Sequence, residues 1–182
     1  MQRCRWVNLN NPLYIRYHDE EWGIPCHCDK QLFELLILES FQAGLSWECV
    51  LNKREAFREA FDGFDIDKVS CYGEQKITEL LGNTAIIRNR LKIKAAVSNS
   101  LAFKKIKSEY GSFDRYIWSF TNGETVFEEY TARTTSPLSD KISADLKKRG
   151  MKFIGSTIIY SYLQAVGIIN GHGKECGLCH NK

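Results

Sequence analysis

The sequence has no run of about 18 apolar residues, the length that a helix needs to cross a bilayer. It also lacks the basic, apolar and small-residue succession of an N-terminal secretion signal. These absences predict a cytoplasmic protein with no membrane partner. A large charge surplus is missing as well, because 25 lysine and arginine residues face 22 aspartate and glutamate residues. A net charge of +3 permits a nucleic acid as partner without demanding one, since binding depends on where charges cluster.

Strand-like alternation of polar and apolar residues is hardly present, and we find no internal repeat or low-complexity tract. Helical patterns predict helices over residues 29–41, 46–60, 65–71, 73–81, 90–108, 140–149 and 156–169. Asp29 and Ser139 are the expected N-caps of two of them, and Gly150 is an expected stop. Only residues 121–137 suggest a long loop or a short hairpin. The sequence therefore predicts one all-α domain over residues 1–182.

Glu39 lies within an apolar stripe of the helix predicted over residues 29–41, which has no polar face and should be central. An ionised carboxylate is costly to bury unless it is paired, so Glu39 is a candidate for ligand recognition or proton transfer. The alternatives are a structural ion pair or exposure at the helix end. Glu34 occupies the first turns of the same helix, where it can reach water, and is the weaker candidate.

Aromatic residues are concentrated near the N-terminus: Trp6, Tyr14, Tyr17, Trp22 and Trp47. Tyr14 and Tyr17 share one face if Pro12 begins a helix. Flat rings can sandwich a flipped nucleobase, and their faces attract a cation. Aromatic clusters also form ordinary cores, so the combination with Glu39 is what favours a binding role.

Seven cysteines, an odd number in a chain that can fold without disulfides, favour metal binding. His172 and Cys176 are one helical turn apart and could bind one ion if the last helix extends that far. Cys4 and His18 offer a second pair. Together they would make a closed Cys2His2 set, which would hold a structural zinc and join the two ends of the chain.

A second cysteine set is also open on spacing alone. Cys176 and Cys179 form a CxxC pair that could recruit Cys26 and Cys28, with His27 and His180 in reserve. Cys49 and Cys71 are expected to be ordinary buried thiols. No HExxH motif is present, which argues against a zinc hydrolase.

Several segments in sequence order resemble the 3-methyladenine DNA glycosylase I family. They are Cys4, Trp6, PLYI (12–15), YHD (17–19), EWG (21–23), Glu39, QAGLSW (42–47), KRE (53–55), IIRNR (86–90), KI (92–93), WSF (118–120), LKKRG (146–150), KF (152–153) and GST (155–157). The resemblance covers essentially the whole chain, and the QAGLSW string is highly specific.

This resemblance implies the helix-hairpin-helix DNA glycosylase superfamily, with helical lobes around a base pocket. The implied activity is the hydrolytic excision of N3-methyladenine after the nucleotide has been flipped out of double-stranded DNA. The enzyme would act as a monomer, release the free base and have no lyase step. The family's zinc ligands fall on Cys4, His18, His172 and Cys176, which decides against the second set.

The resemblance also implies residue roles in this pocket. Glu39 would bind the adenine edge with Tyr17 and Trp47 alongside, and the walls would come from Trp6, Tyr14 and Trp22. A hairpin at residues 82–87 would hold a DNA phosphate with help from Arg88, although Ala85 stands where glycine is common. Residues 99–101 lack the aspartate that related glycosylases use, which fits a labile cationic substrate. A zinc-stapled DNA-binding module without catalysis is the competing hypothesis.

Overall fold

The structure is a computed structural model that describes residues 1–128 and 133–179, and most of these residues are helical. The helices are α1 (Pro12–Glu20), α2 (Asp29–Gln42), α3 (Trp47–Leu51), α4 (Arg54–Ala60), α5 (Ile66–Ser70), α6 (Glu74–Gly82), α7 (Arg90–Tyr110), α8 (Phe113–Trp118), α9 (Pro137–Lys148) and α10 (Ser156–Ala165), with short 3-10 helices η1 (Asp62–Phe64) and η2 (Ser119–Thr121). The strands β1 (Val126–Phe127) and β2 (Ile169–Asn170) pair in parallel. The predicted helical class is confirmed.

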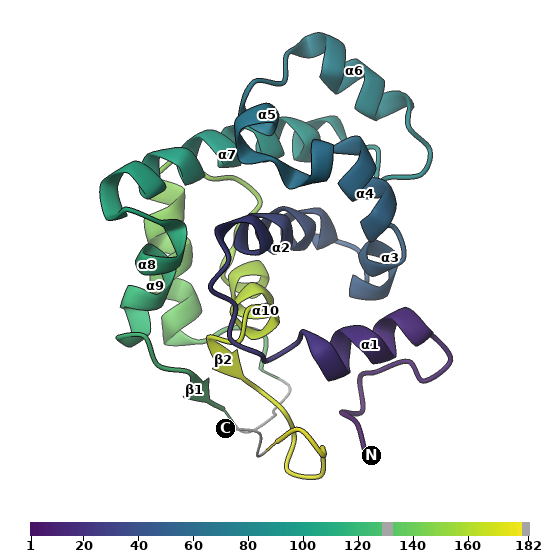
Figure 1. The fold of residues 1–182 in the computed structure, drawn as a ribbon, viewed down its shortest axis with the longest axis vertical. Helices are drawn as coiled ribbons and strands as arrows, with labels where there is room; N and C mark the ends of the chain where they lie inside the picture. The colour runs from purple at the N-terminus through teal and green to yellow at the C-terminus, as the bar shows by residue number, and fades with distance from the viewer. Residues whose placement is uncertain (129–132, 180–182) are drawn as a thin grey trace.

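Helix α2 forms the centre of the fold. All of its residues from 32 to 41 are buried, and α7 and α10 both pack against it. Figure 1 shows α2 crossing the middle of the molecule, between α10 on one side and α4, α5 and α7 on the other. A helix that is apolar on every side needs neighbours on every side, so the predicted central position is confirmed.

The start of α2 differs from the prediction. Cys28, not Asp29, is the N-cap residue. The Asp29 carboxylate instead accepts hydrogen bonds from the backbone N–H groups of Phe113 (3.3 Å) and Asp114 (2.9 Å) at the start of α8. A tertiary contact therefore takes this side chain away from its own helix.

The helix predicted over residues 46–60 is two helices. Ser46 caps α3, accepting a hydrogen bond from the Cys49 N–H. The helix then ends at Leu51, and α4 begins after Asn52 and Lys53. No glycine or proline marks this break, so the apolar spacing alone did not reveal it.

The later helices also have corrected ends. Helix α9 starts at Pro137 with Ser136 as its N-cap, and Ser139 completes a capping box, so Ser139 is not the cap itself. Gly150 follows α9 at φ +92°, as expected of a stop. The helix predicted to reach residue 169 ends at Ala165, because Gly167 has φ +74° and β2 follows.

Three smaller expectations have mixed outcomes. The segment predicted as a loop or hairpin contributes β1, which pairs with β2 rather than within a hairpin; residues 129–132 of that segment lie outside the described residues. Cys49 is only half-buried and Cys71 is exposed, so neither is the buried thiol that was expected; the short helices α3 and α5 bury only one face. None of the helices in the described part of the chain is long and apolar enough to cross a bilayer.

Candidate active site and metal cluster

All six residues predicted for the base pocket line one cavity of about 270 Å³. The lining consists of Trp6, Tyr14, Tyr17, Trp22, Glu39 and Trp47, with Gln42, Arg133, Thr134, Ser161 and Gln164. These residues come from the N-terminal segment, α1, α2, α3 and α10 and from the chain before α9. The cavity is therefore assembled from parts of the chain that are far apart in sequence.

Helix α1 contributes Tyr14 and Tyr17 to the aromatic wall of the cavity, which we define as the rings of Trp6, Tyr14, Tyr17, Trp22 and Trp47. The start of the helix fixes where these two tyrosines lie. Pro12 occupies the first turn, and the Asn11 side chain accepts hydrogen bonds from the N–H groups of Leu13 and Tyr14. Tyr14 and Tyr17 then face the same side, as the spacing predicted.

The rings of this wall contact one another directly. The Trp6 ring lies 5.4 Å from Tyr14 and 4.8 Å from Trp22, centroid to centroid, and Tyr17 lies 5.2 Å from Trp47. Such tilted and edge-to-face contacts hold the rings against each other while leaving other faces available to a ligand.

Glu39 is buried in this cavity, and no cationic side chain among residues 1–128 and 133–179 forms an ion pair with it. Only 2% of the surface of this residue is exposed, and burial raises the pKa of its carboxyl group to about 8. Its Oε2 atom has no hydrogen-bond partner among the described residues, and neither has the indole Nε1 of Trp47. Both the ion-pair and the exposed-end alternatives for Glu39 are therefore wrong. Two unpartnered polar atoms on residues that line one cavity are a feature that needs a ligand or water.

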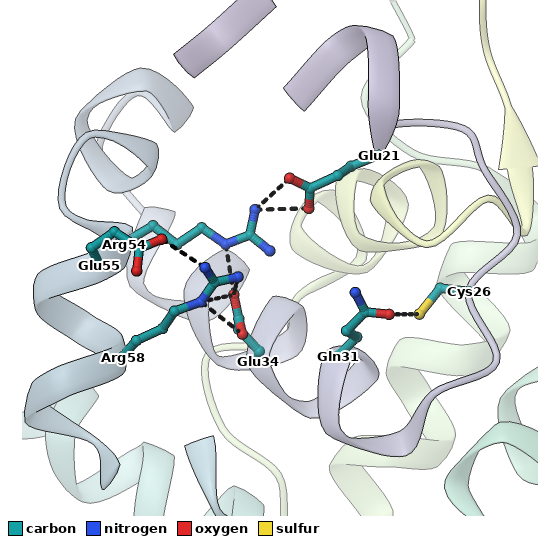
Figure 2. Close-up of polar contacts among 7 residues, drawn as sticks. All are labelled: Glu21, Cys26, Gln31, Glu34, Arg54, Glu55 and Arg58. Carbon is teal, nitrogen blue, oxygen red and sulfur yellow. Dashed lines mark hydrogen bonds and ion pairs between the residues drawn. The ribbon is translucent and has the colours of Figure 1, made fainter. Parts of the chain in front are cut away.

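Glu34 was expected to reach water, and this is wrong. It is 5% exposed and accepts hydrogen bonds from Arg54 (Nε–Oε1, 2.6 Å) and Arg58 (Nη2–Oε1, 2.8 Å), as Figure 2 shows. Both guanidinium groups come from α4, which also contacts α2 through the Phe57 and Phe41 rings, 4.8 Å apart. The two carboxylates of α2 therefore differ: Glu34 is paired with two arginines, whereas Glu39 Oε2 has no partner among the described residues.

The four cysteine and histidine residues predicted as metal ligands form a buried cluster. The ligand atoms of Cys4, His18, His172 and Cys176 all lie within 4.8 Å of one another. The Cys176 Sγ is 3.6 Å from His18 Nε2 and 3.4 Å from His172 Nδ1, and Cys4 Sγ is 3.5 Å from His172 Nδ1. Tetrahedral zinc, with bonds of about 2.3 Å to sulfur and about 2.0 Å to nitrogen, would set sulfur–nitrogen separations of about 3.5 Å. The cluster therefore fits a tetrahedral ion.

The far nitrogens of both histidines are held by other groups. His18 Nδ1 lies 2.8 Å from Asp19 Oδ1, and Asp19 is paired with Arg3. His172 Nε2 lies 3.2 Å from the Trp22 carbonyl oxygen. These contacts place the ring protons away from the cluster, which leaves the inner nitrogens free to bind a metal. Burial, with repulsion from His18, also lowers the pKa of His172 to about 4, so its ring is neutral at pH 7.

The competing cysteine set does not assemble. Within residues 1–128 and 133–179, one grouping of three or more potential metal ligands is found, formed by Cys4, His18, His172 and Cys176 and called the Cys4 cluster below. Cys179 instead donates to the His172 carbonyl, and Cys26 donates to Gln31; His180 lies outside the described residues. The expected route to the cluster is also corrected, because α10 ends at Ala165 and His172 and Cys176 are brought together by irregular chain after β2.

Comparison with known proteins agrees with this geometry. A family model of methyladenine glycosylases matches residues 6–180. The DNA-3-methyladenine glycosylase 1 of Escherichia coli strain K12 is 43% identical over 180 residues, which is 97% of this chain and 96% of that protein. The chain belongs to the methyladenine glycosylase family. It is therefore a glycosylase, a hydrolase of N-glycosyl bonds, and the activity predicted from the sequence is confirmed at this level.

Other relatives of this methyladenine glycosylase support the assignment. The DNA-3-methyladenine glycosylase of Haemophilus influenzae is 39% identical over 178 residues, or 96% of each chain. A solved structure of the Staphylococcus aureus 3-methyladenine DNA glycosylase I superposes with a TM-score of 0.92 at 38% identity, covering 97% of this chain and 96% of that one. The architecture of the family is thus preserved over nearly the whole chain.

Five cavity residues of this methyladenine glycosylase were not predicted as site residues. Ser161 and Gln164 are polar residues three positions apart in the otherwise apolar α10, so their spacing could have identified them. Gln42 follows Glu39 by one turn on α2 and carries the same signal. Arg133 and Thr134 come from irregular chain before α9, where no periodic pattern could have revealed them.

The chain between α6 and α7 forms the tight turn that was expected near residues 82–87. The Asn83 side chain accepts from the Ala85 N–H (2.9 Å), and Lys53 Nζ donates to the Ala85 carbonyl (3.1 Å). Arg88 is exposed beside it. Further along α7, Asn99 is buried and bonds both backbone groups of Lys152, so it fixes the chain before α10.

The raised pKa of Glu39 predicts that the difference in stability between the wild type and Glu39→Gln depends on pH. The folded protein binds this proton more tightly than the unfolded chain, because the pKa rises from 4.5 to about 8. The resulting stabilisation is fully present below pH 4.5 and is lost as the pH rises toward 8, by at most about 1.4 kcal/mol per pH unit. We expect the unfolding free energy of the wild type to fall relative to that of Glu39→Gln between pH 5 and 8. Urea unfolding of both proteins across this range measures it, and a constant difference would contradict the pKa shift.

Proposed function

We propose that this chain removes N3-methyladenine from double-stranded DNA by flipping the damaged nucleotide and binding its base in the cavity that contains Glu39. The observation that carries this proposal is the pair of unpartnered buried atoms, Glu39 Oε2 and Trp47 Nε1, in a cavity walled by aromatic rings. The relatives are DNA-3-methyladenine glycosylases, and one relative has been solved in complex with 3-methyladenine, which supports the same substrate here.

The polar atoms of the cavity complement an adenine edge. A carboxyl oxygen of Glu39 would accept a hydrogen bond from the exocyclic amine, and Trp47 Nε1 would donate to a ring nitrogen. An adenine bound in this way would form hydrogen bonds with the two side-chain atoms that otherwise have no partner. An analogue that lacked these groups would leave them unpaired, which is the strongest source of selectivity that a buried site has.

Methylation supplies the rest of the selectivity. A methyl group on N3 makes the adenine cationic, so the base leaves the sugar readily and its glycosidic bond is already weakened. The faces of Tyr17, Trp47 and the neighbouring rings attract such a cation, whereas a neutral undamaged adenine gains less. The positive base would also lower the pKa of Glu39, because opposite charges stabilise each other. Glu39 therefore acts chiefly in recognition, with water as the nucleophile and no lyase step.

We further propose that the turn between α6 and α7 is the hairpin of a helix-hairpin-helix glycosylase and contacts the DNA backbone. Support comes from the packing of α6 against α7 and from the exposed Arg88 beside the turn. Backbone amides and a cation at such a turn can hold a phosphate and set the register of the protein on the duplex. Ala85, at a position where the hairpin commonly has glycine, would reduce the room for that phosphate. Residues 1–182 would act as one domain and as a cytoplasmic monomer.

Zinc is the ion that the Cys4 cluster fits best, since two thiolates and two neutral imidazoles are a preferred tetrahedral set. When bound it would supply structure rather than chemistry, because four protein ligands leave no position for water or substrate. Cys4 and His18 would hold the N-terminal segment to His172 and Cys176 near the C-terminus. The aromatic wall begins in that same N-terminal segment, so the ion would support the cavity indirectly.

The test is to incubate the zinc-loaded protein with methylated duplex DNA and to separate the released bases by chromatography. We expect free 3-methyladenine, with the DNA strand intact until the abasic site is cleaved by hot alkali. Strand cleavage without alkali would contradict a reaction that lacks a lyase step. DNA binding without any released base would instead favour the non-catalytic module, although that hypothesis leaves the burial of Glu39 unexplained.

A further inference from the structure

The cavity wall formed by α1 is attached to the rest of the fold by a small number of polar contacts. Helix α1 packs against α3, and Figure 1 shows it at the edge of the molecule, away from the centre of α2. At its start, Asn8 and Asn11 each donate to Glu48 Oε1 at 2.8 Å. Its other end carries His18 of the buried cluster and Asp19, which is paired with Arg3. The turn that follows and leads into Trp22 is held by a further group.

That group is Arg54 on α4, which joins two separate segments. Its Nη1 donates to both oxygens of Glu21, at 2.9 and 2.7 Å, and its Nε donates to Glu34 Oε1 at 2.6 Å. Figure 2 shows the guanidinium lying between these two carboxylates. Burial opposes the charge of Arg54, but the carboxylates of Glu34 and Glu21 raise its pKa, so the group stays charged. Only 8% of its side chain is exposed.

The two carboxylates lie on the two chain segments that carry the aromatic residues and Glu39. Glu34 lies on α2, about 7 to 8 Å along the helix axis from Glu39. Glu21 is the residue that ends α1, and it lies between Tyr17 and Trp22. The N–H groups of Glu21 and Trp22 both donate to the Tyr17 carbonyl, so the Glu21 backbone is joined directly to the backbone of the aromatic residues on either side of it.

We propose that Arg54 is a positioning residue for base excision, because its contacts with Glu21 and Glu34 set the distance between the aromatic wall and Glu39. The proposal rests on the base-binding role of the cavity given above. A buried ion pair gains little stability over well-packed apolar side chains, but it fixes geometry. Arginine suits this task because its planar fork donates in two directions at once, which an ammonium group on a lysine cannot reproduce.

Two variants separate positioning from stability. Glu21→Gln keeps the shape of a half-buried side chain and removes only the attraction for Arg54, while Arg54→Lys keeps the charge and removes the fork. Arg58→Gln is the matched control, since Arg58 binds Glu34 and Glu55 but does not reach Glu21. The measurements are kcat and KM for excision from methylated DNA, the Kd of free 3-methyladenine from tryptophan fluorescence, zinc content and the urea midpoint.

We expect Glu21→Gln and Arg54→Lys each to lower kcat by about tenfold to hundredfold, as a misplacement of about 1 Å does. KM should change little, because contacts with the DNA backbone lie elsewhere, and the Kd of the free base should rise. The double variant should be no worse than the more affected single variant, since both changes break one contact. Arg58→Gln should keep kcat within about threefold.

Several results would overturn the proposal. Wild-type kcat and base affinity in Glu21→Gln would do so even if Arg54→Lys failed to fold. Additive losses in the double variant would show that the two residues act independently, and an equal loss of kcat in Arg58→Gln would point to general disruption of the ion network. A wild-type protein that neither releases nor binds 3-methyladenine would overturn the base-site assignment as well, whereas an active wild type with active variants would overturn only the role of Arg54.

Discussion

Glu39→Gln is expected to lower the excision of 3-methyladenine by about a hundredfold or more while the fold and the metal content stay as in the wild type. The amide has nearly the same shape as the carboxyl group, so the packing around α2 is preserved. It cannot become negative, however, and in a buried site the attraction between a carboxylate and a cationic base is weakly screened by water. If the transition state is stabilised by about 2.7 kcal/mol less, the reaction is about a hundredfold slower.

The measurement is single-turnover release of base from methylated duplex DNA, with enzyme in excess. Glu59→Gln is a suitable control, because Glu59 is an exposed carboxylate on α4 outside the cavity lining. The control should release base at the wild-type rate. Unchanged excision by Glu39→Gln, in a protein with wild-type metal content, would remove Glu39 from the base site.

The residues of the candidate site could be singled out from the sequence because they break local rules. Glu39 interrupts an apolar stripe, and the aromatic residues are concentrated in one short part of the chain; both are visible without a structure, and the cavity brings them together. The same logic failed for Glu34. Its pairing depends on how α4 crosses α2, and no spacing within α2 reports on a contact with Arg54.

Helix positions were also better predicted than helix ends. The apolar spacing that identifies α2 and α7 is repeated many times along each helix, so single exceptions matter little. An end depends on one or two residues and on what they contact. Asp29 could cap its own helix, but it binds the start of α8 instead, and the chain after Ala165 leaves the helix to pair with β1. Such competition between local and tertiary hydrogen bonds is decided only in the folded chain.

Cys176→Ser is expected to remove most of the bound zinc and to lower stability more than any change at the base cavity. The Cys176 thiol lies within 3.6 Å of both histidine ligands, so its loss opens the cluster on two sides. A thousandfold weaker affinity for an ion that binds only the folded state costs about 4 kcal/mol of unfolding free energy at saturating metal. Thermal unfolding and metal analysis of the purified protein measure both effects.

Cys179→Ser separates this cluster from the competing set. Its thiol is close to the cluster but donates to the His172 carbonyl, so the variant should keep its zinc and nearly all of its stability. Full zinc content in Cys176→Ser, or lost zinc in Cys179→Ser, would contradict the ligand assignment. The folded fraction of Cys176→Ser should still prefer 3-methyladenine, because no ligand of the cluster lines the cavity. The cluster contacts the aromatic wall through the His18 ring, which packs against Trp6 and Trp22, and through the Trp22 carbonyl, which contacts His172. Metal loss should therefore loosen the aromatic wall as well as weaken the fold.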